Sequence, residues 1–344
     1  MSKRGTIIGG GSFLREGVKE HVLAIVDLDA EAPKARLLGM RFLAHGVCID
    51  PNDPDRAVVF EKKGPGACYV DLRAIRVLSH IPTPRERHFY GHGAYSSDGT
   101  LIYATESFID DDLRGVLVVR DAKTFAELGT LPTFGTAPHD CMLLDDGKTM
   151  VVTNGGGALR GGVRPSVTYV DVAAEKLLEK VELKPGRFNA GHIAMTSRGD
   201  VALVSAPREG LPPRAPRIGA VSLKPAGKPI ETMSKPKSVC ERMKGETLSV
   251  LIDERDGTVL ATHPEGDMVT MWQLATGKLI RKYDEFHDPR GVALTLDRRH
   301  YVVSHLDGGA AVLSLVSVET RELEERVMHS FTSGSHIFVH DLAA

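Results

Sequence analysis

Five histidines recur at one position of a repeating sequence pattern. Each directly precedes a short apolar strand and a turn, as in His92 (HGAYSSDG) and His139 (HDCMLLDDG). Only 14 of the 344 residues are His, so five at seven equivalent positions are not expected by chance. Neutral imidazoles that converge with carboxylates bind Cu, Fe or Zn, and imidazole also suits acid–base chemistry near neutral pH. The seven aligned residues are His45, His92, His139, His192, Leu248, Arg290 and His336.

A repeated set of strands must position these histidines. Seven segments share an alternating apolar strand, a turn with Asp or Gly, and a second strand; they start near Val22, Ala67, Val116, Val167, Ile218, Met268 and Ala311. Two further strands lie between successive segments, and Asp-Gly pairs mark several of the tight turns. Four strands in a period of about 45–50 residues are typical of one β-propeller blade.

The frame of the repeat predicts how the fold closes. The chain opens on a strand at 6–10 and ends on an inner strand that begins at His336. Pairing these two strands would complete the last blade and remove two exposed edges. We therefore predict an all-β fold, a single seven-bladed β-propeller over 1–344 with four antiparallel strands per blade. Residues 207–246 are predicted to be an irregular, basic, Pro-rich insertion, either a solvated loop or a docking patch for an acidic partner.

Further polar residues fall on the same rim of the predicted propeller. An inner strand starts beside the central channel and the next strand returns to that face, so strand starts and strand ends meet there. Two repeats lack the inner-strand histidine but end the next strand in His263 or His305. The predicted metal ligands are His45, His92, His139, His192, His263, His305 and His336. The predicted ligand-binding residues are His88, Asn154, Glu265 and Asp307. The catalytic candidates are Glu106, Asp140 and Arg290. Of these, Asp140 or Glu106 could accept a hydrogen bond that fixes the tautomer of a histidine ring.

Two interpretations of the histidines remain open. In the first, at least three of them bind a metal or a substrate in an axial funnel. In the second, pairs such as Gly91-His92 form structural turns, as in WD-repeat propellers. Those repeats also carry a Trp-Asp dipeptide, whereas the single Trp272 is followed by Gln273. The residues of that hydrogen-bonded turn network are therefore largely missing.

Composition and charge argue against several classes of function. A formal net charge of −2 and an aromatic content of 6% give no basic or stacking surface for nucleic acid. No run of about 18 apolar residues predicts a membrane span, and neither a phosphate-binding loop nor a GxSxG motif is present. The N-terminus lacks the apolar segment of a signal peptide. We expect a periplasmic protein if a leader has been removed and a cytoplasmic one otherwise.

One stretch of the chain resembles a family of bacterial propellers labelled domain of unknown function 1513. It runs RHFYGHG from Arg87, then YSSDGTLIYATES and GTAPHDCMLLDDGKTMVVTNGG. The resemblance covers most of the chain, is densest between residues 85 and 200, and implies an exported protein linked to iron or copper handling. The histidine ring and the PHD triplet at 138–140 are also similar to nitrous oxide reductase, whose propeller holds a multi-copper cluster. The matching motif positions are His88, His92, Glu106, His139, Asn154 and His192.

These observations lead to three hypotheses about function. The first is a metal-binding propeller with copper or iron, and less readily zinc, in its funnel, acting as a metal-handling factor or a metal-dependent oxidoreductase on a small molecule. The second is an interaction scaffold whose loops bind a protein partner. The third is a lactonase-like, metal-dependent hydrolase with carboxylates and histidines around one ion.

Overall fold

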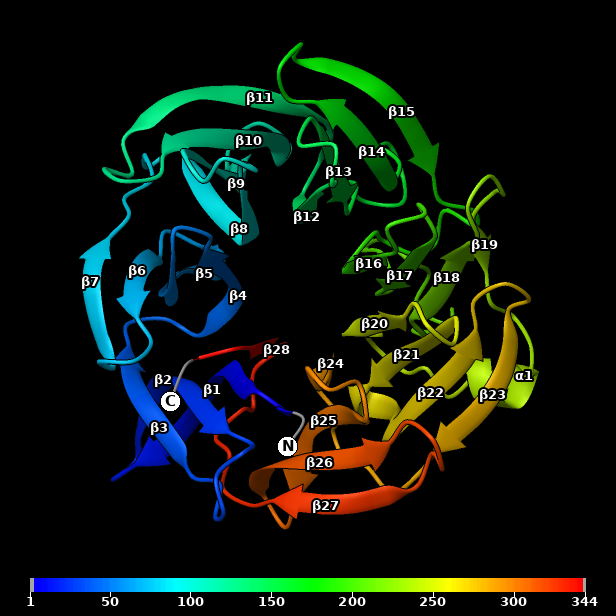
Figure 1. Cartoon of the computed structure of the whole chain (residues 1–344). Coiled ribbons are helices and arrows are strands. Elements are labelled where there is room, and N and C mark those ends of the chain that lie inside the picture. Colours follow the sequence, from blue (N-terminus) through cyan, green and yellow to red (C-terminus); the bar gives the residue numbers. More distant parts are fainter. Residues whose placement is uncertain (1–2, 343–344) are drawn as a thin grey trace.

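Antiparallel sheets surround a central axis in the computed structural model, which describes residues 3–342 (Figure 1). The first sheet has the order β28-β1-β2-β3, with β1 (Thr6–Arg15), β2 (Val18–Asp27), β3 (Ala35–Met40) and β28 (Ile337–His340). An eight-stranded sheet follows, with β4 (Ala44–Asp50), β5 (Asp53–Gly64), β6 (Ala67–Asp71), β7 (Arg76–His80), β8 (Arg87–Tyr95), β9 (Leu101–Phe108), β10 (Arg114–Asp121) and β11 (Glu127–Thr136).

Four further sheets of four strands complete the ring in chain order. They contain β12 (Pro138–Leu143), β13 (Thr149–Asn154), β14 (Ser166–Asp171) and β15 (Lys176–Glu182), then β16 (Ile193–Met195), β17 (Val201–Ser205), β18 (Ala220–Lys224) and β19 (Glu231–Thr232). The last two contain β20 (Val250–Asp253), β21 (Thr258–His263), β22 (Met268–Gln273) and β23 (Lys278–Tyr283), then β24 (Val292–Leu294), β25 (His300–Asp307), β26 (Ala310–Ser317) and β27 (Leu323–Val327).

The all-β propeller predicted from the repeat is confirmed, but the strands form six sheets and not seven separate ones. The difference lies in β5, which at 12 residues is the longest strand of the described chain. Its end pairs with β8 at Lys62↔Tyr90 and Gly64↔Phe89. This short ladder joins the four-stranded units β4–β7 and β8–β11 into one eight-stranded sheet.

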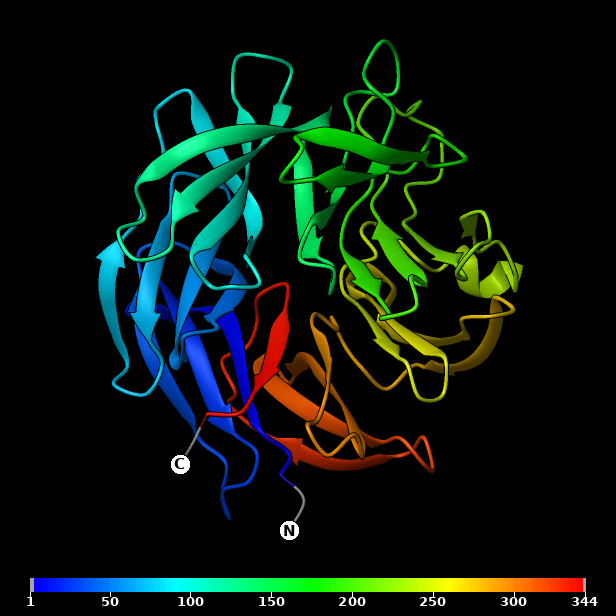
Figure 2. The same ribbon diagram turned by 45° about the horizontal axis from the view of Figure 1, so that its top comes forward.

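The predicted closure between the two ends of the chain is confirmed. β1 pairs with β28 from Thr6↔His340 to Gly9↔Ile337, and both views show the two strands side by side (Figure 2). A glycine of β1 also allows a close approach to the neighbouring strand β4, because a Cβ on Gly10 would lie 2.0 Å from the carbonyl oxygen of Ala44. The sheet edges that the two ends would otherwise leave open are thereby paired.

The core lies between neighbouring sheets, because each strand directs alternate side chains to opposite faces. Strands such as β17, with the sequence VALVS, are buried along their whole length. The predicted insertion at 207–246 contains β18, β19 and the four-residue helix α1 (Lys237–Cys240). The 3-10 turn η1 (Pro264–Gly266) is the other helical element of the described residues, and no helix there is long and apolar enough to cross a membrane.

Candidate metal centre

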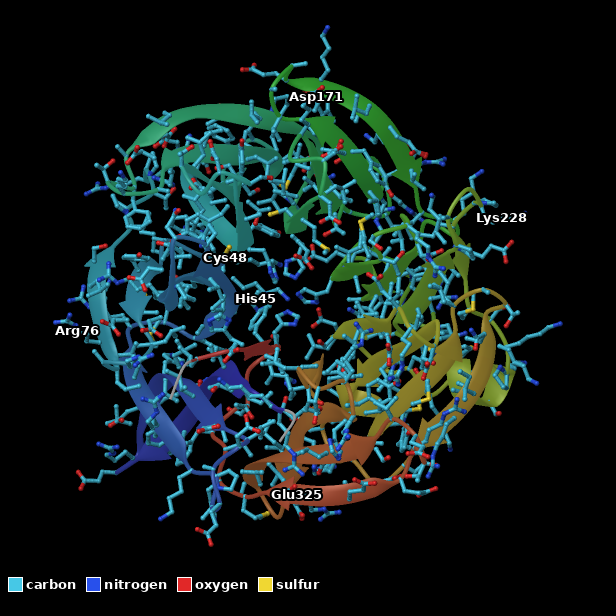
Figure 3. All side chains as sticks on the ribbon, viewed as in Figure 1. His45, Cys48, Arg76, Asp171, Lys228 and Glu325 are labelled. Atoms are coloured by element: carbon cyan, nitrogen blue, oxygen red, sulfur yellow. The ribbon has the colours of Figure 1, made fainter. Side chains whose placement is uncertain are left out.

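Five histidine side chains meet on the propeller axis. Two are the second residues of β4 and β12, one lies within β8, and two directly precede β16 and β28. Each is 9% exposed or less, and the ring centroids that contact one another are 3.9 to 5.4 Å apart. In Figure 3 His45 points to the axis, where ring nitrogens gather. We call this group the histidine cluster; its members are His45, His92, His139, His192 and His336.

The Nε2 atoms of the cluster converge around His192. Its Nε2 lies 2.5 Å from that of His139, 2.7 Å from that of His336 and 3.2 Å from that of His45. One ring nitrogen from each of His45, His92, His139 and His192 lies within 4.8 Å of the others. Metal–nitrogen bonds of about 2.0–2.1 Å space neighbouring ligand nitrogens about 2.8–3.4 Å apart in square or tetrahedral sites. The 3.2 Å spacing falls within this range, and the 2.5 and 2.7 Å spacings are shorter by a few tenths of an ångström, so small movements of the rings would let one ion bind.

The opposite ring nitrogens are held by acceptors. The Nδ1 of His192 donates to the carbonyl of Leu248 at 2.6 Å, and the Nδ1 of His139 donates to the carbonyl of Tyr90 at 3.2 Å. A carbonyl only accepts, so each Nδ1 carries the hydrogen and each Nε2 of the neutral ring keeps a free lone pair. Acceptors of this kind fix the tautomer of metal-binding histidines.

Asp140 performs the same role for His92. Its Oδ1 lies 3.3 Å from the Nδ1 of His92, while its Oδ2 accepts the amide hydrogen of Ile193 at 3.1 Å. The Nε2 of His92 is buried and has no hydrogen-bond partner among the described residues. A buried polar atom without a partner carries a desolvation cost that a bound ion would remove. Asp140, one of the two acceptors considered from the sequence, is thus the one that lies beside a ring of the cluster.

The rings of the cluster are neutral at neutral pH. Burial, reinforced by His336, holds the pKa of His45 and of His192 well below the ordinary histidine value. Burial, reinforced by the Lys62 ammonium, does the same to the pKa of His139. Neutral imidazole is the form that ligates metals.

Hydroxyl groups of the second strands secure the starts of the inner strands. Thr153 accepts the amide hydrogen of Asp140 at 2.9 Å, and Thr262 accepts that of Ser249 at 2.9 Å. Ser304 accepts the amide hydrogen of Gly291 at 2.8 Å. Sequence analysis missed this feature, although a small hydroxyl residue recurs at the same place in the second strands of several repeats.

The other two catalytic candidates, Glu106 and Arg290, form their ion pairs and hydrogen bonds with residues outside the histidine cluster. Glu106 is fully buried and accepts hydrogen bonds from Arg87 at 3.0 Å and Arg120 at 2.7 Å. Its charge is thus balanced inside its own sheet, and the expectation that it could orient a histidine ring is wrong. Arg290 faces Asp288 at 3.3 Å and the carbonyl of Gly334 at 3.4 Å.

His263 and His305 do not join the cluster, contrary to expectation. Both ring nitrogens of His263 face threonine hydroxyls, at 3.2 Å on Thr247 and 2.8 Å on Thr270. The Nε2 of His305 lies 2.7 Å from the hydroxyl of Ser314. Each ring comes from the end of a second strand and packs against the third strand of its own sheet, so neither reaches the axis.

The predicted ligand-binding residues are dispersed. His88 is half-buried in β8, and Glu265 is exposed on η1. Asn154 is buried and donates to a threonine hydroxyl of β14 at 3.0 Å, which holds β13 to β14. Asp307 forms a 2.6 Å ion pair with an arginine of β27. None of these contacts involves the histidine cluster.

A cavity of about 500 Å³ leads to the cluster. His139 is the cluster member that lines it, together with residues of β5, β8 and the loops that follow β13 and β17. Sequence analysis also missed Lys62, which lines this cavity and lowers the pKa of His139 through its charge. As a lysine that occurs in only one repeat, it carries no signal in the repeat alignment.

Solved structures that resemble this chain are β-propellers. A chain of Kuenenia stuttgartiensis hydrazine synthase is similar with a TM-score of 0.68 and 13% identity, covering 87% of this chain and 92% of that chain. The β-propeller domain of Myceliophteria thermophila Cps50 (Swd1) is similar with a TM-score of 0.63 and 14% identity, covering 92% and 98%. At these identities the likeness shows the fold alone.

Comparison with curated proteins gives no match. The family resemblance of the 85–200 stretch extends over most of the chain, because the family match begins in β3 and ends in β28. The chain therefore belongs to the DUF1513 family, described as proteins of unknown function, which matches residues 39–338.

Proposed function

We propose that the protein binds a copper or iron ion in the histidine cluster. The observation that carries this proposal is the 2.5 Å approach of the Nε2 atoms of His139 and His192. Both rings carry their hydrogen on Nδ1, so two lone pairs face each other without a proton between them. A metal ion bonded to both nitrogens turns this repulsion into two bonds.

The donor set favours copper and is compatible with iron. Imidazole suits Cu, Fe, Zn and Ni, and Cu²⁺ has the highest affinity of the divalent first-row metals for nitrogen sites. Burial raises the pKa of the Cys48 thiol to about 12 and raises that of Cys141, so neither thiol next to the inner strands offers a thiolate. An ion held by neutral imidazoles alone retains its positive charge and, when bound, supplies one-electron chemistry or a Lewis acid.

The residues of the chain have separate roles in this proposal. The Nε2 atoms of His45, His92, His139 and His192 hold the ion, with His336 as a fifth donor from the closing strand. Asp140 and the carbonyls of β8 and the β19–β20 connection fix the tautomers. The surrounding sheets leave each ring of the cluster 9% exposed or less, and His139 lines the neighbouring cavity.

We further propose that the eight-stranded sheet corresponds to two blades, β4–β7 and β8–β11, which gives a single propeller domain of seven blades. Two observations support this count. The β5–β8 ladder has only two pairs, whereas β4 and β5 are paired over most of β4. The inner strands β4 and β8 each deliver one histidine to the axis, as the separate sheets of β12, β16 and β28 do.

Metal content tests the proposed function. The purified protein is incubated with Cu(II) or Fe(II), freed of excess metal on a desalting column, and measured by elemental analysis. We expect about one ion per chain for the wild type and for His263→Gln, which removes an equally buried histidine outside the cluster. His192→Gln should lose the ion. Less than stoichiometric metal in the wild type, or equal metal in both variants, would refute the proposal.

A further inference from the structure

The cavity beside the histidine cluster is rich in cationic side chains. Its volume of about 500 Å³ is typical of sites for small molecules. Two of the four cations and two of the three carboxylates that line it are exposed to solvent, where their charges are screened, so the less exposed charges are two cations and one carboxylate. The cations are Lys62, Lys63, Arg208 and Arg217, and the carboxylates are Asp112, Glu209 and Glu246.

Arg208 keeps its full positive charge. The side chain is 5% exposed, and its hydrogen bonds all go to backbone carbonyls, including 2.7 Å to Gly157 and 2.8 Å to Gly186. No carboxylate within the described residues pairs with it. These bonds satisfy its donors without cancelling its charge, so a positive field extends into the cavity.

Lys62 lies between the cavity and the cluster. It lines the cavity, and its charge acts on His45, His92, His139 and His336. Its nearest carboxylate oxygen belongs to Glu246, at 3.6 Å. Because Lys62 and His139 line the same cavity, an anion placed there between the ammonium and an ion in the cluster would be attracted by both.

We propose that this cavity binds a small oxyanion, a carboxylate or phosphate compound, between Lys62 and the ion of the histidine cluster. The inference rests on the proposed metal site and adds the ligand class to it. Tyr90 lines the same cavity, and its hydroxyl has no hydrogen-bond partner among residues 3–342. It is a free donor for the anion, while Glu246 competes with the anion for Lys62.

Calorimetric titration of the copper-loaded protein with succinate and with inorganic phosphate tests the inference, with neutral succinamide as the control ligand. At least one anion should bind and succinamide should not. Lys62→Met should weaken anion binding at least tenfold with unchanged copper content, and Glu246→Gln should strengthen it. Lys228→Met is the matched control, because this exposed lysine lies at the outer edge of the propeller (Figure 3). The affinity of this variant for the anion should equal that of the wild type.

The outcomes separate the two proposals. If copper loads but neither anion binds, or if Lys62→Met binds as tightly as Lys228→Met, the oxyanion site is refuted and the metal site stands. If copper does not load, the proposed function fails, and this inference fails with it. Binding of succinate alone identifies a carboxylate ligand, and binding of phosphate alone identifies a phosphate compound.

Discussion

Acidification should destabilise the metal-free protein through the histidine cluster. The pKa values of His45, His139, His192 and His336 all lie well below the ordinary value, chiefly because the rings are buried. In the unfolded chain each ring takes up a proton near pH 6.5. The unfolded state thus binds more protons than the folded state, and the free energy of unfolding falls as the pH drops through that value.

The size of the effect follows from this linkage. Between pH 7.5 and pH 5.5, each ring that stays neutral in the folded state costs about 1.4 kcal/mol of stability. The four rings together cost about 5 kcal/mol, comparable with the whole stability of many domains, about 5–15 kcal/mol. The stabilising contribution is fully present above about pH 6.5 and is progressively lost below it.

Urea unfolding at the two pH values measures this loss. The double variant His139→Gln/His192→Gln removes two of these rings and should lose about 3 kcal/mol less stability than the wild type between pH 7.5 and 5.5. His263, whose pKa burial lowers to about 3, contributes equally to both proteins. An equal pH dependence in the wild type and the double variant would refute the assignment of the effect to the cluster.

Three further predictions test individual contacts. Gly10→Ala places a Cβ 2.0 Å from a backbone oxygen and should lower the free energy of unfolding in urea by more than about 3 kcal/mol. The control Gly39→Ala meets no atom within 4 Å and should change that free energy by less than about 1 kcal/mol. Glu106→Gln leaves the buried Arg120 without a counter-ion, whereas Arg87 keeps its ion pair with Glu127; the change should cost about 3–5 kcal/mol but leave copper content unchanged. Asp140→Asn should preserve the fold and weaken copper binding about 10–100-fold in a competition titration, and a change of less than about twofold would contradict its orienting role.

The strands, their closure and the position of five cluster histidines were predictable from the sequence for one physical reason. Each blade repeats the same alternation of apolar residues, and the turns fix where strands begin. A residue that precedes the inner strand in every repeat must then lie at the axis, whatever its type. His45 and His336, from opposite ends of the chain, meet at a centroid distance of 4.7 Å for this reason.

The direction of side chains at strand ends was not predictable in the same way. A shift of one residue in a strand moves a side chain to the other face. His263 and His305 lie in the second strands β21 and β25, as expected, but their rings contact the hydroxyls of Thr270 and Ser314. The partners of Glu106 and the pairing of β5 with β8 depend on contacts between strands that no local pattern encodes.

One of the two repeats that lack a histidine at this position orients a ring of the cluster instead. The unit of β20–β23 places Leu248 and Ser249 where five units place His and its successor. Leu248 offers its carbonyl to the Nδ1 of His192 at 2.6 Å, and the hydroxyl of Ser249 lies 3.4 Å from the Nδ1 of His336. A sixth ring at this position would add another lone pair to a crowded centre, whereas the backbone carbonyl orients a ring that is already there. The exception to the repeat thus fixes the tautomer of His192, the ring around which the other Nε2 atoms converge.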